Sequence, residues 1–65
     1  MNAKVFQLLN RLANQQVITA ARSGFLAKKY RANKDVNEVC SLLFEDFDPN
    51  KLDLLVDAAN KLSNM

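Results

Sequence analysis

The sequence predicts an all-α protein, a small bundle of three to four helices in a single domain spanning residues 1–65. Apolar residues recur at spacings of three and four, and no segment alternates apolar and polar residues as a half-buried strand does. One Gly and one Pro are too few for the many turns of a β protein. Hydrophobic residues make up 49% of the chain, which is a globular composition.

A long N-terminal helix is expected from residue 3 to residue 23, with Asn2 as its N-cap. Gly24 allows two interpretations. The helix ends there in a Schellman-type motif, with Phe25 as the apolar residue that follows, or it runs through Gly24. Residues 25–33 then form a basic connector or a short helix. One half of the long helix is apolar and comprises Val5, Phe6, Leu8, Leu9, Leu12, Ala13, Val17 and Ala20.

Two shorter helices complete the expected fold. Asp35 is a suitable N-cap for the first of them, with Glu38 as its capping-box partner. Asp48 and Pro49 start the second, since Asp caps a helix and Pro fits its first position. The Asp48-Pro49 junction predicts an angled or antiparallel helical corner. The apolar stripe before this corner comprises Val36, Val39, Cys40, Leu43, Phe44 and Phe47.

Charge divides the chain into a basic and an acidic half. Residues 1–34 contain seven basic and no acidic residues, whereas residues 35–65 contain seven acidic and two basic residues, a net charge of −5. The asymmetry has two interpretations. The halves attract one another within the fold or between subunits, or the basic half binds a polyanion, DNA or RNA.

The basic half supplies the candidate nucleic-acid-binding residues. On one long helix, a narrow arc contains Lys4, Arg11 and Arg22. The other cations surround Tyr30, so the Tyr30 ring could stack on a base while these cations contact the phosphates. The candidates are Lys4, Arg11, Arg22, Lys28, Lys29, Tyr30, Arg31 and Lys34.

Residues 16–30 resemble the helix-turn-helix pattern. The small residue, the turn glycine and the two apolar positions of that pattern are met by Ala20, Gly24, Phe25 and Tyr30. Two positions that the pattern buries hold Thr19 and Ser23 in place of larger apolar residues. The resemblance implies a recognition helix that carries Lys28, Lys29 and Arg31 to a major groove.

Several large apolar residues fall on otherwise polar helix arcs and indicate a second, apolar surface. The candidate protein-interface residues are Ile18, Phe25, Leu42 and Leu54. A chain of this size buries little core alone, so we expect a homodimer. The alternative function is therefore a protein-binding adaptor, inhibitor or accessory subunit.

The composition also restricts the chemistry. The absence of His and the single Cys exclude an intrachain disulfide, a His-based catalytic site and an ordinary zinc site. The acidic stretch from Asp46 has Lys51 where a calcium loop needs Gly. We expect no enzyme, metal or cofactor. The sequence has no long apolar run, so we expect no contact with a membrane. The single Cys40 favours the cytoplasm. We therefore expect a cytoplasmic regulatory protein that contacts DNA or RNA.

Overall fold

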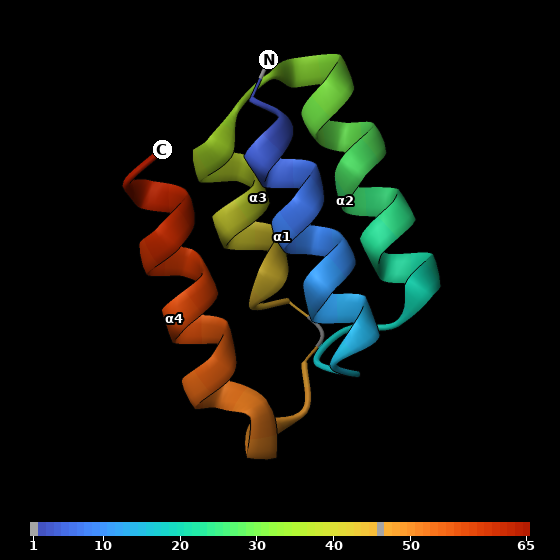
Figure 1. Ribbon diagram of the computed structural model, residues 1–65, viewed down its shortest axis with the longest axis vertical. Helices are drawn as coiled ribbons and strands as arrows, with labels where there is room; N and C mark the ends of the chain where they lie inside the picture. The colour runs from blue at the N-terminus through green and yellow to red at the C-terminus, as the bar shows by residue number, and fades with distance from the viewer. Residues whose placement is uncertain (1, 46) are drawn as a thin grey trace.

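The computed structural model describes residues 2–45 and 47–65, and this part of the chain forms four α-helices and no strand. The elements are α1 (Ala3–Asn14), α2 (Ala20–Asn33), α3 (Val36–Leu43), a 3-10 turn η1 (Pro49–Lys51) and α4 (Leu52–Ser63). Successive helices run in opposite directions, and both chain ends lie toward the same end of the bundle (Figure 1). The all-α prediction is confirmed.

One apolar core joins all four helices. Its residues recur at three- and four-residue spacings, so each helix directs one stripe inward. The buried residues are Val5, Leu8, Leu9, Leu12, Val17, Ile18, Leu26, Tyr30, Val39, Leu43, Leu55, Ala58 and Leu62. The core leaves the opposite faces of the helices free for polar and charged residues.

The prediction of one long N-terminal helix is wrong, because the chain turns between Asn14 and Ala20. Gln16 takes the left-handed conformation, with φ of 59°. The Val17 N–H donates to the Leu12 carbonyl at 2.9 Å, and the Gln16 N–H donates to the Ala13 carbonyl at 3.0 Å. These two bonds form a Schellman motif, and the buried Val17 and Leu12 supply its apolar contact.

Gly24 lies inside α2 and ends no helix. The helix runs through it, as in the second interpretation, but begins at Ala20 rather than at residue 3. Thr19 caps this start by accepting the Arg22 N–H at 3.0 Å. The helix-turn-helix resemblance is therefore wrong in its main feature, because the glycine that should form the turn is helical.

The other predicted helix starts are confirmed. Asn2 accepts the Lys4 N–H at 2.9 Å, Asp35 accepts the Asn37 N–H at 3.0 Å, and Asp48 accepts the Asn50 N–H at 2.9 Å. Pro49 opens the 3-10 turn that leads into α4. Half of the capping box at Asp35 forms, because Asp35 also accepts the Glu38 N–H at 3.3 Å. The reciprocal half does not, because the Glu38 carboxylate accepts from the Asn33 side-chain amide at 2.9 and 3.1 Å instead.

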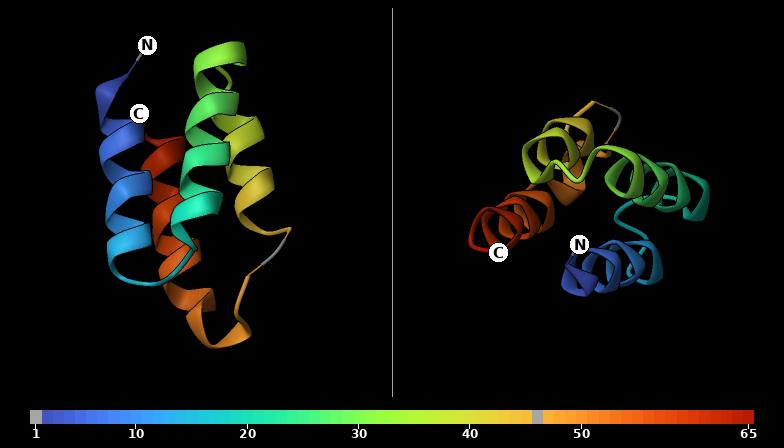
Figure 2. Two further views of the ribbon diagram at one scale, coloured as in Figure 1. Left: turned by 90° about the vertical axis from the view of Figure 1, so that its right-hand side faces the viewer. Right: turned by 90° about the horizontal axis from the view of Figure 1, so that it is seen from above.

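The charge asymmetry of the sequence becomes an asymmetry in space. Seen along the bundle, α1 and α2 lie together on one side, and α3 and α4 lie together on the other (Figure 2). Residues 2–34, which contain seven basic and no acidic residues, form the first pair of helices. Most of the acidic residues lie in or beside the second pair. We call these pairs the basic half and the acidic half.

Candidate nucleic-acid interface

Exposed cations are densest around the C-terminal half of α2. They do not all share one side of the helix, because Arg31 lies about 200° around it from Lys29, with its Cζ 5.1 Å from the ring centroid of Phe6 on α1. We call Lys28, Lys29, Arg31 and Lys34 the basic surface of α2; all four are exposed. Among residues 2–45 and 47–65, none of them has a carboxylate oxygen within 4.0 Å. Their positive charge is therefore presented to solvent.

Phe25 is the exposed aromatic residue of α2, with 41% of its surface accessible. It lies three residues after Arg22 and four before Lys29, so both cations are its neighbours on the helix surface. The Arg22 Cζ lies 5.0 Å and the Lys29 Nζ 5.7 Å from the ring centroid. The aromatic residue among the exposed cations is thus Phe25.

Tyr30 does not occupy the position expected for it. Its ring is 4% exposed, packs edge-on against Phe6 at 5.3 Å between ring centroids, and belongs to the core. Its hydroxyl accepts the Asn2 N–H at 3.0 Å. The expectation that this ring stacks on a base is wrong for this structure, because the side chain is buried between α1 and α2.

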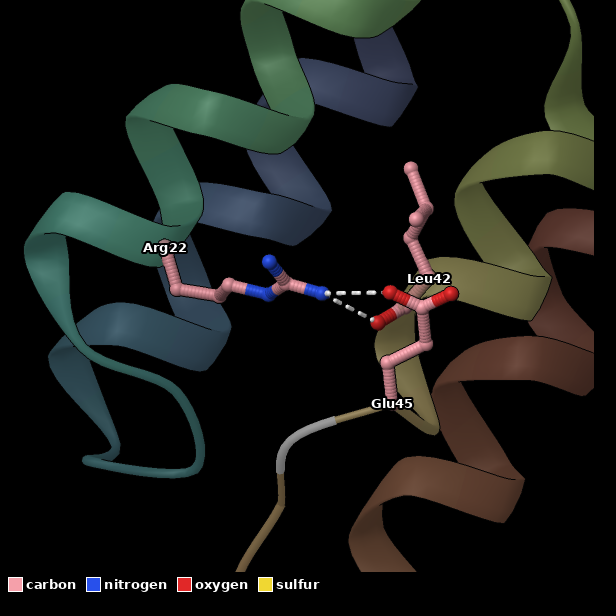
Figure 3. A network of polar contacts seen from close by, with 3 residues as sticks. All are labelled: Arg22, Leu42 and Glu45. Atoms are coloured by element: carbon pink, nitrogen blue, oxygen red, sulfur yellow. Dashed lines mark hydrogen bonds and ion pairs between the residues drawn. The ribbon is translucent and has the colours of Figure 1, made fainter.

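Arg22 points across to the acidic half (Figure 3). Its Nη2 donates to the Leu42 carbonyl at 2.8 Å and lies 3.7 Å from the Glu45 Oε2. In the described ranges, this is the one ion pair between the two halves. Attraction inside the fold therefore accounts for Arg22, whereas the basic surface of α2 has no such partner.

Lys4 and Arg11 lie on a different face of the molecule. They are seven residues apart on α1, so they share one side of that helix. Phe6, which contacts Arg31 and Tyr30 of α2, lies about 200° around the helix from Lys4. The predicted arc of Lys4, Arg11 and Arg22 is wrong, because Arg22 lies on α2 and these two cations point away from it.

The four apolar candidates divide into two pairs. Ile18 is only 7% exposed and Leu42 is half-buried, so their interface role is not supported by exposure. Phe25 and Leu54 are exposed, as expected. The helical spacing assigns Leu52 and Val56 to the apolar arc of the last helix, together with Leu55 and Leu62. They are instead as exposed as Leu54, and they lie one turn apart on the same side of α4.

Two shallow hollows border Phe25. The smaller one, of about 370 Å³, is lined by Phe25, Lys28, Lys29, Ala32 and Asn33. The larger one, of about 840 Å³, is wide open and extends from Phe25 past Arg22 to Ile18 and Phe47. Cations and apolar surface therefore meet at the Phe25 ring.

Other types of site have little support in the described ranges. No group of three or more Cys, Asp or Glu side chains is placed to hold a metal ion there, and Asp46, where the calcium-loop register begins, lies outside them. Cys40 is half-buried, with its sulfur 3.9 Å from the Ala59 carbonyl oxygen. In the same ranges, no helix has the length and apolar character needed to cross a membrane.

Comparison with other proteins adds no family. No protein-family model matches the sequence, and comparison with curated proteins and with solved structures finds no significant match.

Proposed function

We propose that this protein is a small non-enzymatic regulatory protein that binds DNA or RNA through the basic surface of α2. The observation that carries the proposal is that these four cations are exposed and lie in a half without acidic residues. Their charge is unmatched by any described carboxylate. Positive groups of this kind neutralise phosphates and release the counterions around a nucleic acid. A nucleic-acid partner and the lone Cys40 also favour a cytoplasmic location.

The size of the surface sets the expected strength of binding. Lys28 and Lys34 are separated by about 9 Å along the helix at 1.5 Å per residue, which is about the axial rise of three nucleotides in one strand. About three phosphate contacts then correspond to a slope of about −3 for the logarithm of the binding constant against the logarithm of salt concentration. We expect weak, salt-sensitive binding directed at the backbone.

Helix stabilisation is the competing role for these cations. Basic residues in the last turn of a helix interact favourably with its dipole, and Arg31 lies in the last turn of α2. This effect falls off within one turn, so it does not explain Lys28 and Lys29. These two lysines are therefore the residues to replace.

The test compares two double variants that each lose two positive charges. Lys28→Ala with Lys29→Ala should weaken binding to labelled duplex DNA and structured RNA and reduce the salt slope by about two. Lys51→Ala with Lys61→Ala, in the acidic half, should leave both unchanged. Fluorescence anisotropy at several salt concentrations measures both quantities. Equal losses in the two variants, or unchanged binding in the first, would contradict the proposal.

A second candidate function is self-association through α4. Leu52 and Val56 expose apolar surface on one side of this helix, which packs mainly against α3 and η1. We propose a second copy of the chain as the partner, since dimerisation supplies the core that a chain of this size lacks. This surface lies in the acidic half, away from α2, so the two proposed functions are compatible.

A further inference from the structure

We infer that the preferred ligand of the basic surface of α2 is a single-stranded nucleic acid, one of whose bases stacks on Phe25. The inference rests on the proposed function, because it names the class of nucleic acid that the same surface binds. It starts from the exposed position of this ring, which lies among cations on a helix whose other aromatic residue, Tyr30, is buried in the core.

The surroundings of the ring fit a base with its phosphates. Lys28 and Lys29 line the hollow beside Phe25, together with Ala32, a small residue that allows close approach. An unpaired base offers an apolar face to the ring while its phosphates remain within reach of the lysines. In duplex DNA the bases are stacked on one another, so they cannot use Phe25 in this way.

The neighbouring cations differ in their freedom to move. Arg22 is held by the Leu42 carbonyl at 2.8 Å and lies beside Glu45, so its guanidinium stays in place, with the Cζ 5.0 Å from the Phe25 ring centroid. The exposed Lys29 ammonium lies 5.7 Å from the ring centroid, close to the limit of about 6 Å for a cation–π contact. A base that stacks on Phe25 replaces this ammonium and leaves it free to contact a phosphate.

A matched pair of aromatic residues makes the inference testable. Phe44 is exposed as well, but it lies at the end of α3 in the acidic half and has no described cation over its ring. The Phe44 ring also packs edge-on against Phe47, with 6.0 Å between the ring centroids. Phe25→Leu and Phe44→Leu each remove one exposed ring, one from each half. Both retain an apolar side chain at an exposed position, so the fold should persist.

The experiment measures affinity for short oligo(dT) and oligo(U) and for a DNA duplex of the same length. The wild-type protein should prefer the single strands. Phe25→Leu should reduce single-strand affinity by about tenfold, since stacking of one base changes affinity by a factor of about 5 to 150, and should leave duplex affinity unchanged. Phe44→Leu should change neither affinity.

A fluorescent reporter checks the contact itself. The chain contains no Trp, so Phe25→Trp and Phe44→Trp each introduce a single fluorophore. Oligo(dT) should quench the fluorescence of the first variant and not of the second. Equal affinity for single strands and duplex, or an equal effect of Phe25→Leu on both, would overturn the inference while leaving the proposed function intact. Absence of binding to any of these nucleic acids would overturn both.

Discussion

Arg22 links the two halves of the molecule through a single guanidinium group. Glu45 is 65% exposed, so the ion pair at 3.7 Å contributes little, and the hydrogen bond to the Leu42 carbonyl at 2.8 Å is the stronger contact. That carbonyl belongs to the last turn of α3 and also accepts the Glu45 N–H at 3.2 Å, so Arg22 is a second donor to it at the end of the helix. Arg22 therefore caps α3 from a neighbouring helix. Such a contact joins residues 20 positions apart, and nothing in the local sequence indicates it.

Tyr30 gives a prediction at the same scale, because its ring and its hydroxyl have separate roles. Tyr30→Phe keeps the buried ring and removes the oxygen that accepts the Asn2 N–H. We expect a loss of about 1 kcal/mol or less in the free energy of unfolding, measured by urea denaturation with circular dichroism. Nucleic-acid affinity should stay at the wild-type value, since the ring is buried. A selective loss of affinity in this variant would show that Tyr30 contacts the ligand directly.

At the scale of the helices, the caps were predictable and the first break was not. Asn2, Asp35 and Asp48 act through residues two positions away, so the local sequence suffices to predict them. The break at Gln16 escaped prediction because the apolar pattern continues into Val17 and because Gly24 offered a more typical helix ending. Ile18 was the one residue that indicated a break in the helix. It falls on the polar side of a continuous helix, and the turn before Thr19 is what allows it to be buried.

The basic surface of α2 was predictable only in part from the local sequence. Its four cations follow directly from the acid-free sequence, and their exposure follows from the apolar positions of the helix. The burial of Tyr30 depends on how α1 packs against α2, where Phe6 and Asn2 enclose it. Sequence periodicity assigns a residue to one side of a helix, but it does not show which neighbouring helix covers that side.

Gly24, which lies inside α2, and Gln16, which lies in the turn before it, lead to a paired prediction about glycine. Gly24→Ala should stabilise the protein by about 1 kcal/mol, because Gly24 is helical and an added Cβ meets no atom within 4 Å. Gln16→Gly should also stabilise it, by about 1 kcal/mol, because Gln16 holds a left-handed conformation that favours glycine. Urea denaturation of both variants measures the changes. Destabilisation by Gly24→Ala would mean that the chain turns at Gly24 in place of Gln16.

At the scale of the whole molecule, the separation of charge gives the two proposed contacts opposite responses to salt. Nucleic-acid binding by the basic half weakens as salt rises, because counterion release contributes less. Self-association through α4 brings together two acidic halves, each with a net charge of −5. Salt screens this repulsion and leaves the apolar contact intact, so added salt should strengthen the dimer.

Sedimentation velocity at low and high salt tests this contrast. We expect the dimer fraction to rise with salt. We expect Val56→Glu to give a folded monomer, since it places a charge within the apolar contact. Leu54→Glu is the matched control, because Leu54 lies about 200° around α4 from Leu52, and it should leave the dimer intact. Loss of the dimer in Leu54→Glu alone would move the interface to the opposite side of α4. A dimer that weakens with salt would instead indicate contact between the basic half of one copy and the acidic half of another.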